Sequence, residues 1–462
     1  MADMNKLDAI LQEYHEEALE TMRKWVRQPS VKLPKEAENA PFGPDNRKML
    51  DIAMADAVKL GFDVKDIDGY AAQADMGEGE EIDALAILGH LDIVPVGDGW
   101  TKDPFGAEIC DGKVYGRGTS DDKGYVVAAL YAMAAVKKAG IPLKRRVRLI
   151  MGCDEETGME DMRYYRQHAV MPRMGFSPDA SYPVINIEKG GCVVKLSGKT
   201  AQDGVKFKCF NQGERINVIP GNATAEIYGG EEEVKKALEY GEKLGVPVEA
   251  RCENGVVTIT TVGKTGHAAM GEEARNAIGQ MLLILRHVGV KGAIAELAEF
   301  VGMTYYGEHL GICMEDRMSG KLTCSLDIIR ADEEKVEALC DIRYPLLYNA
   351  QVGIKVINMT LNGRLQAEML GEHGPHFVSE NSDLVKGLLA AYEEVTGEKG
   401  YTIAIGGGTY ARTMEEGVAF GGLFPGQEEM AHQADEYIGV EDFYSDMRIF
   451  AHAIVHLCGA EC

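Results

Sequence analysis

Apolar residues recur with two different periods along the chain. Spacings of three and four predict a helix over residues 5–27. The same spacing predicts further helices over 44–60, 123–138, 160–168, 383–395 and 442–457. Short unbroken apolar runs predict buried strands at 85–88 and 146–151. Helices that alternate with buried strands indicate an α/β layer around a mainly parallel sheet.

The pattern changes between residues 193 and 370. Strand-like segments there occupy 193–196, 223–228, 255–262, 322–330 and 352–361, and acidic helical segments occupy 231–244 and 332–337. This alternation predicts a separate α+β domain. We therefore expect an α/β domain made of residues 1–191 and 380–462, interrupted by an inserted domain over 192–379. Two similar α+β halves could make up the insertion.

Composition and charge restrict the class of protein. The chain has 462 residues, which is too long for one ordinary core, with 45% hydrophobic and 26% charged residues. Its net charge of −25 argues against a nucleic-acid partner or an anionic membrane surface, since both attract basic faces. No apolar run approaches the roughly 20 residues that span a bilayer. The start lacks an export signal, and the ten cysteines contain no C-x-x-C pair. We expect a cytoplasmic protein with reduced thiols.

Two groups of polar residues follow the predicted strands of the first segment. His90 and Asp92 come after the strand at 85–88, and residues two apart in extended chain share a face. Asp92 could therefore orient His90 through its second ring nitrogen. Glu155 and Glu156 follow the strand at 146–151, where adjacent side chains point in opposite directions. One glutamate could bind a metal while the other acts as a general base.

A glycine-rich loop over 116–124 presents Asp121 and Asp122 before a helix. A phosphate-binding loop is excluded as an interpretation, because two aspartates would repel phosphate and no G-x-x-x-x-G-K-[ST] pattern is present. Asp121 could bridge two metals through its two oxygens, and Asp122 could cap the helix. Asp179, His267 and His432 are further isolated candidates, each weak alone.

In this order, the motifs resemble the M20 family of metallopeptidases, and most of all its PepV-type, carnosinase-like dipeptidase branch (Xaa-His dipeptidases). The resemblance rests on Gly-Arg-Gly-x-x-Asp-Asp-Lys-Gly at 116–124, Asp-Glu-Glu-Thr-Gly at 154–158 and Pro-Asp-Ala at 178–180. It extends from residue 89 to residue 436. It implies an α/β zinc-peptidase catalytic domain with a mainly parallel sheet and an inserted α+β lid domain.

The resemblance also implies a role for each candidate residue. His90 and Asp179 would hold one zinc ion, Glu156 and His432 would hold the other, and Asp121 would bridge them before a cis peptide bond. A mixed nitrogen and oxygen ligand set suits zinc, although Mn²⁺ or Co²⁺ could substitute.

Catalytic roles follow from the same resemblance. Glu155 would be the general base, Asp92 would orient a ligand, and His267 would stabilise the oxyanion of the transition state. Relatives often carry proline four residues after this histidine, where the present chain has Gly271.

Substrate binding is inferred from the same branch. Arg343 resembles the arginine that binds the substrate carboxylate, and a guanidinium fork suits that role. Asn217 resembles a polar contact of the lid. Gly408 and Thr409 resemble a loop that touches the C-terminal end of the substrate. Structural alternatives are an ordinary salt bridge for Arg343 and a tight turn for the glycines.

The sequence therefore predicts a dinuclear zinc dipeptidase that acts on short peptides and binds neither nucleic acid nor membrane. We expect a monomer, with a dimer as the alternative. An N-acyl-amino-acid deacylase, such as a succinyl-diaminopimelate desuccinylase or an aminoacylase, would use the same metals. A non-catalytic metal-binding protein is the alternative of another class, but it would not need the free carboxylate of Glu155.

Overall fold

The computed structural model describes residues 3–201 and 203–460. The chain divides into two compact units. Unit 1 comprises Met1–Ile187, Phe377–Ile403 and Gly408–Cys462, and unit 2 comprises Glu188–His376 and Ala404–Gly407. Whether the segment predicted as an inserted domain, 192–379, folds independently stays a prediction.

Unit 1 is built on a nine-stranded sheet with the order β1-β2-β6-β3-β7-β23-β8-β21, with β22 paired to β8. Its central strands β6, β3, β7 and β23 are parallel, whereas β1, β2 and β8 pair antiparallel. The predicted α/β fold with a mainly parallel central sheet is confirmed. The nine strands are β1 (Asp63–Ile67), β2 (Ala71–Met76), β3 (Leu85–His90), β6 (Val147–Gly152), β7 (Met174–Ser177), β8 (Val184–Glu188), β21 (His376–Phe377), β22 (Thr402–Ile405) and β23 (Glu416–Ala419). A separate three-stranded sheet contains β4 (Glu108–Cys110), β5 (Lys113–Tyr115) and β24 (Tyr437–Gly439).

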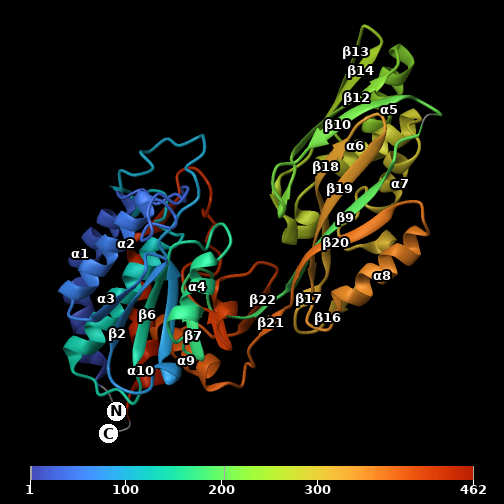
Figure 1. Cartoon of the computed structure of the whole chain (residues 1–462). Coiled ribbons are helices and arrows are strands. Elements are labelled where there is room, and N and C mark those ends of the chain that lie inside the picture. The colour runs from blue at the N-terminus through green and yellow to red at the C-terminus, as the bar shows by residue number, and fades with distance from the viewer. Residues whose placement is uncertain (1–2, 202, 461–462) are drawn as a thin grey trace. The chain divides into compact units, whose positions relative to one another are not determined.

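Helices cover both faces of this sheet. They are α1 (Met4–Val26), α2 (Pro44–Lys59), η1 (Glu81–Asp83), α3 (Lys123–Ala139), α4 (Glu160–His168), α9 (Asp383–Thr396), η4 (Tyr410–Thr413) and α10 (Val440–Cys458). Leu85 and Ile87 of β3 join the core beneath α1, α3 and α10, whereas Ala86 and Leu88 join a smaller core beneath α4. Alternate residues of the strand therefore face opposite helical layers, with α1 and α3 on one side and α4 on the other (Figure 1).

The buried helix α3 lies immediately after the glycine-rich loop. Nearly all of its residues are buried, and it ends at Gly140, whose φ of +71° suits a left-handed C-cap. Its neighbours in the core include α1 and α10. The loop that precedes it is therefore attached to the most deeply buried helix of unit 1.

Unit 2 is an eight-stranded antiparallel sheet with the order β13-β14-β12-β10-β18-β19-β9-β20, packed against four helices. The eight strands are β9 (Gly190–Lys199), β10 (Phe207–Gln212), β12 (Asn222–Tyr228), β13 (Val248–Glu253), β14 (Val256–Val262), β18 (Thr323–Ala331), β19 (Lys335–Tyr344) and β20 (Gln366–His373). Two further two-stranded sheets pair β11 (Val218–Ile219) with β15 (Gly266–His267) and β16 (Glu315–Asp316) with β17 (Gly320–Lys321). The helices are α5 (Glu231–Leu244), η2 (Ala268–Glu273), α6 (Ala277–Val288), α7 (Ala293–Phe300), η3 (Glu308–Leu310) and α8 (Ala350–Leu361).

Two of the secondary-structure predictions for unit 2 are wrong. Residues 352–361, predicted as a strand, belong to helix α8, because Asn349 caps the helix and Gly353, Ile357 and Leu361 form a buried stripe at four-residue spacing. Residues 332–337, predicted as a helix, form a turn over 332–334 and the first three residues of β19. Asp332 accepts hydrogen bonds from the backbone N–H groups of residues 334 and 335, which favours the turn.

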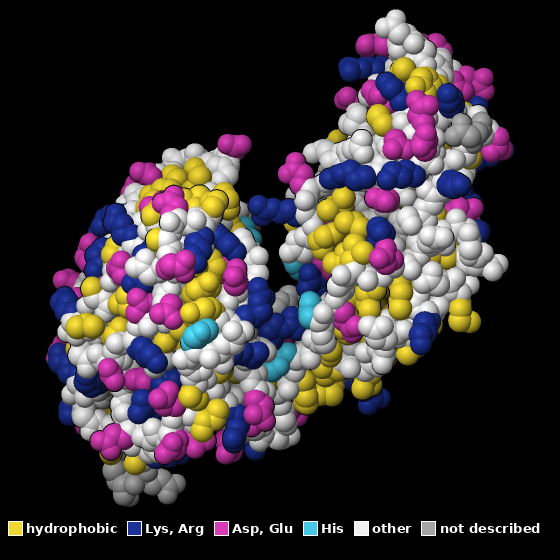
Figure 2. Space-filling view, viewed as in Figure 1, with side chains coloured by type: hydrophobic (Ala, Val, Ile, Leu, Met, Phe, Trp, Pro, Cys, Tyr) yellow, Lys and Arg dark blue, Asp and Glu magenta, His cyan; other side chains and the backbone are white. Residues whose placement is uncertain are grey.

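The net charge of −25 is not gathered on the visible face of either unit, where acidic and basic side chains are interspersed (Figure 2). Within residues 3–201 and 203–460, no helix combines the length and apolar character needed to cross a membrane.

Candidate active site and metal centre

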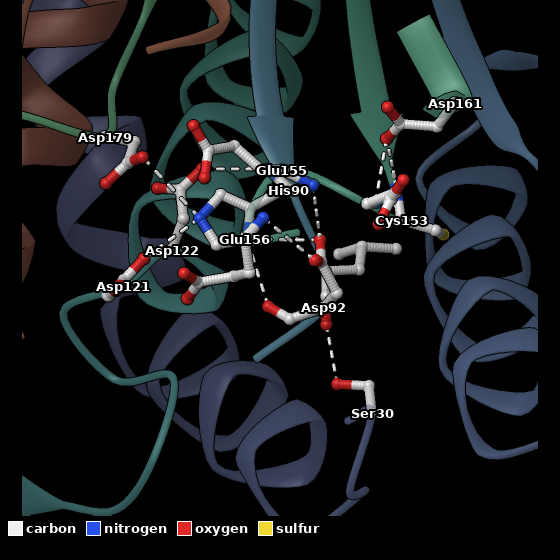
Figure 3. A network of polar contacts seen from close by, with 12 residues as sticks. Ser30, His90, Asp92, Asp121, Asp122, Cys153, Glu155, Glu156, Asp161 and Asp179 are labelled. Atoms are coloured by element: carbon white, nitrogen blue, oxygen red, sulfur yellow. Dashed lines mark hydrogen bonds and ion pairs between the residues drawn. The ribbon is translucent and has the colours of Figure 1, made fainter. Parts of the chain in front are cut away.

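Three parallel strands of unit 1 deliver polar side chains to one edge of the sheet. His90 ends β3, Glu155 and Glu156 follow β6, and Asp179 follows β7. His90 lies opposite Gly152 in the register of β3 and β6. The carboxyl ends of parallel strands therefore coincide, and these side chains converge beyond them (Figure 3).

Asp121 lies between two histidines. Its Oδ1 is 2.9 Å from Nε2 of His90, and its Oδ2 is 3.0 Å from Nε2 of His432. The peptide bond between Asp121 and Asp122 is cis. A small sheet pairs β5, before the Asp121 loop, with β24, after His432. This pairing explains how residues more than 300 positions apart come together.

Each histidine has a second carboxylate of its own. Oδ2 of Asp179 lies 3.6 Å from Nε2 of His90, and Oε2 of Glu156 lies 3.0 Å from Nε2 of His432. Possible ligand atoms of His90, Asp121 and Glu156 all lie within 4.8 Å of one another. All five predicted metal ligands are thus brought together in unit 1.

Glu155 points into the same cluster. It forms a second group with His90 and Asp179, in which possible ligand atoms also lie within 4.8 Å of one another. Burial, reinforced by the charge of Asp179, raises the pKa of Glu155 well above its ordinary value. The carboxylate therefore lies next to the candidate ligands in a setting that favours holding a proton.

Asp92 connects the two strand ends. The ring nitrogen Nδ1 of His90 lies 3.0 Å from the backbone oxygen of Asp92 and 3.4 Å from its Oδ1. The two carboxylate oxygens of Asp92 accept the N–H groups of Glu155 and Glu156, each at 3.2 Å. Asp92 thus touches His90 as expected, and it also holds the turn that carries both glutamates.

The donor set fits divalent metal ions. Burial, reinforced by the charge of Asp121, raises the pKa of Glu156 to about 7 and also raises that of Asp179. Oε1 of Glu156 is a buried oxygen without a hydrogen-bond partner among the described residues. Hydrogen bonds to Asp121 and Glu156 raise the pKa of His432 to about 11. The clustered carboxylates therefore favour a positive charge among them. A combination of imidazole and carboxylate groups is a suitable ligand set for zinc.

A family model identifies the chain. The model described as "Peptidase family M20/M25/M40" matches residues 86–456, a range that includes every residue of this cluster. The chain belongs to this family. The resemblance inferred from the motifs is confirmed, and the M20 peptidase is a hydrolase that acts on peptide bonds. Peptidases of this family depend on metal ions, in agreement with the candidate ligands.

Sequence relatives cover nearly the whole M20 peptidase. The Bacillus subtilis (strain 168) protein named "Putative dipeptidase YtjP" is 38% identical over 90% of this chain and 92% of its own. The "Beta-Ala-Xaa dipeptidase" of Lactobacillus delbrueckii subsp. lactis is 34% identical over 93% of each chain. Human carnosine dipeptidase 1 shares the fold, with a TM-score of 0.60 at 15% identity over 99% of both chains.

Several residues that support the site were not predicted. Asp122 occupies the N-cap position of α3, but its side chain makes no capping hydrogen bond; its Oδ2 instead accepts the N–H of His90 at 3.0 Å. Glu436 accepts hydrogen bonds from Arg117 and from the backbone of the Asp121 loop. The Asp-Asp pair in the glycine-rich loop is the one local pattern that could have pointed to a supporting role for Asp122. No local pattern links Glu436 to Arg117.

The turn after β6 is also stabilised by Asp161. Asp161 accepts the N–H groups of Cys153 and Asp154 at 2.7 and 2.9 Å, and it also accepts a hydrogen bond from the hydroxyl of Tyr410. Gly152 is required at the strand end, because a Cβ there would lie 2.2 Å from the Tyr410 hydroxyl. These contacts fix the start of the segment that carries the two glutamates.

The predicted substrate contacts are divided between the units. Asn217 and His267 lie together in unit 2, where Val218 pairs with His267 and the oxygen of Asn217 accepts the N–H of Ala268. His267 is exposed, and its Nδ1 accepts the N–H of Ala269. Arg343 also lies in unit 2, on β19.

Gly408 and Thr409 belong to unit 1. Gly408 is exposed, whereas Thr409 is buried and its hydroxyl caps η4 by accepting the N–H of Ala411 at 3.1 Å. The side chain of Thr409 therefore has a structural role here. A role in substrate binding stays a prediction for both residues.

Proposed function

We propose that this M20 peptidase is a dinuclear zinc dipeptidase. The observation that carries the proposal is the position of Asp121, which directs one oxygen to His90 and the other to His432. A carboxylate between two imidazoles, each with a further carboxylate beside it, is the pattern expected for two metal sites that share one ligand. The names of the relatives, a putative dipeptidase and a β-Ala-Xaa dipeptidase, support short peptides as substrates.

The proposed ligands divide into two sets. His90, Asp179 and Asp121 would hold one zinc ion, and His432, Glu156 and Asp121 would hold the other. Mn²⁺ or Co²⁺ could substitute, because the donors are nitrogen and oxygen only. When bound, the two ions would supply Lewis acidity, which acidifies a water molecule and polarises the scissile carbonyl.

The remaining roles fall to the chain itself. Glu155 takes the proton of the attacking water and transfers it to the leaving amine nitrogen. Asp92 positions Glu155 through its hydrogen bond to the backbone. In unit 2, His267 would donate a hydrogen bond to the carbonyl oxygen as it gains charge, and Arg343 would bind the substrate carboxylate. Asn217, Gly408 and Thr409 are proposed as further substrate contacts. A cytoplasmic location and a monomeric state stay predictions.

The test compares Glu155→Gln with Glu160→Gln, a control at an exposed carboxylate near the same turn. Both variants and the wild type are loaded with zinc, and metal content is measured with the rate of hydrolysis. Glu155→Gln should retain metal and lose at least about a hundredfold in kcat, the range of general-base catalysis. An unchanged kcat would refute the role of Glu155.

A substrate panel tests the reaction class. Dipeptides are compared with N-succinyl and N-acetyl amino acids at equal concentration. Cleavage of dipeptides is expected. Cleavage confined to the acylated amino acids would replace the proposal with a deacylase, and no cleavage by the metal-loaded protein would favour a non-catalytic metal-binding protein.

A further inference from the structure

The guanidinium of Arg343, on β19, is held by Asp341 of the same strand and by the backbone of Gly406, which follows β22. Nε of Arg343 donates to Oδ1 and Oδ2 of Asp341 at 2.8 and 3.0 Å, and Nη2 donates to Oδ2 at 2.8 Å. Nη1 donates to the backbone oxygen of Gly406 at 3.3 Å. Asp341 is 2% exposed, and the side chain of Arg343 is 14% exposed. The fork is therefore fixed by a buried carboxylate on its own strand.

These contacts leave a defined set of donors. A guanidinium has five N–H groups. The contacts to Asp341 and Gly406 use the one on Nε and one each on Nη1 and Nη2. One N–H therefore remains on each terminal nitrogen. Donors on the two terminal nitrogens of a guanidinium can serve the two oxygens of a carboxylate.

A second buried carboxylate in unit 2, that of Asp327, holds the backbone of Asn217. Asp327 is the extra residue of a β-bulge in β18, where the register shifts between Leu326 and Ile328. Its Oδ2 accepts the N–H of Asn217 at 2.8 Å, and its Oδ1 is hydrogen-bonded to Ser325, which lies opposite Asp341 in the register. Asn217 has a φ of +75°, a conformation that this hydrogen bond helps to hold.

We propose that Asp341 and Asp327 are positioning residues for substrate recognition, and that Asp341 presents the outer edge of Arg343 to the free α-carboxylate of a peptide while Asp327 holds Asn217. This inference rests on the proposed dipeptidase function. Because the guanidinium of Arg343 is ordered before the substrate arrives, little side-chain entropy is lost on binding.

The arrangement discriminates between carboxylate and amide termini. A carboxylate offers two acceptors to the two remaining N–H groups, whereas a carboxamide offers one acceptor and an NH₂ group that would face a donor. Asp341 also balances the charge of Arg343. Burial, together with the charge of Asp341, raises the pKa of Asp327 to about 8, so the cluster is close to neutral at pH 7 before the substrate arrives.

The first experiment uses the zinc-loaded wild type with leucyl-leucine and leucyl-leucinamide. Preference for the free carboxylate is expected, with kcat/KM at least about tenfold higher for the acid, since charge-assisted hydrogen bonds are lost with the amide. Equal kcat/KM for the two would overturn the inference while the dipeptidase function stands. No cleavage of either would overturn both.

The second experiment compares Asp341→Asn with Asp332→Asn. Asp332 is an exposed aspartate in the turn between β18 and β19, so it is a matched control. Asp341→Asn should raise KM for leucyl-leucine by about tenfold or more with a smaller effect on kcat, and leave cleavage of the amide nearly unchanged. Asp327→Ala should also raise KM. An equal loss of kcat/KM for leucyl-leucine and leucyl-leucinamide in Asp341→Asn would show that Asp341 only maintains the fold. A loss confined to kcat would show the same.

Discussion

The buried carboxylate of Glu436 allows a quantitative prediction. Its Oε2 accepts Nη1 of Arg117 at 2.5 Å. Its Oε1 accepts the N–H groups of Gly118 and Ser120, both at 3.0 Å, and the hydroxyl of Ser120 at 3.2 Å. Glu436 and Arg117 are 0% and 1% exposed. Glu436→Gln therefore leaves the charge of Arg117 buried without its counter-charge.

The expected cost follows from that burial. Removing one partner of a buried ion pair costs about 3–5 kcal/mol, because desolvation of the remaining charge is no longer offset. At roughly 2 °C per kcal/mol for a unit of this size, the melting temperature should fall by about 6–10 °C. Metal affinity should fall about 10- to 100-fold, as is usual for residues that orient metal ligands, because Ser120 precedes Asp121.

The assay is differential scanning calorimetry of the zinc-free protein at pH 8, with zinc affinity measured by calorimetric titration. The pH is chosen because burial and the charge of Asp121 raise the pKa of Glu436 to about 7 despite its contact with Arg117. Glu428→Gln is the control, at an exposed carboxylate in the preceding loop. The double variant Arg117→Met/Glu436→Gln should lose less stability than the two single variants summed. A change of less than about 1 °C in Glu436→Gln would refute the reasoning.

Three further predictions concern metal, backbone space and a surface ion pair. A chelator should abolish hydrolysis and zinc should restore it, and a full rate in protein shown by elemental analysis to lack metal would contradict this. Gly89→Ala should destabilise by about 1–3 kcal/mol and weaken metal binding in a titration, because its Cβ would lie 2.4 Å from Oδ2 of Asp122; an unchanged melting temperature would argue against it. Asp8→Asn should lower the melting temperature by only about 1–2 °C, because the side chains of Asp8 and Arg448 are partly exposed, although the second partner, His452, is buried. A loss of activity would not fit.

Much of the candidate site could be anticipated from local patterns. Imidazoles and carboxylates are common metal ligands, and a parallel sheet presents side chains at its strand ends, so His90 and Glu156 could be selected from their places after apolar runs. Asp179 and His432 gained their roles only from the resemblance to the M20 family. Asp121 was selected from its glycine-rich loop. In the structure these residues lie together, and their roles as ligands stay a proposal.

Other features depended on contacts that no local pattern records. The segment 352–361 has a β-branched composition, yet it is helical because its capping residue and its buried stripe fit the surface of the unit 2 sheet. The acidic segment 332–337 was predicted as a helix, but hydrogen bonds from the backbone to the side chain of Asp332 favour a turn, and residues 335–337 begin β19. Local propensity was overridden in both places.

Periodicity and motif spacing are properties of short segments, so they were enough to assign the α/β class, the family and the side chains proposed to bind metal. Which carboxylate meets which partner depends instead on contacts between distant segments. Glu429 and Glu436 lie in one loop region, yet only Glu436 is fully buried against Arg117, more than 300 residues away in the chain. Asp341 and Arg343 are two residues apart on β19, but no local pattern places the Gly406 carbonyl beside them. Such pairings arise from packing between distant segments, and the energy of a buried charge depends on that packing.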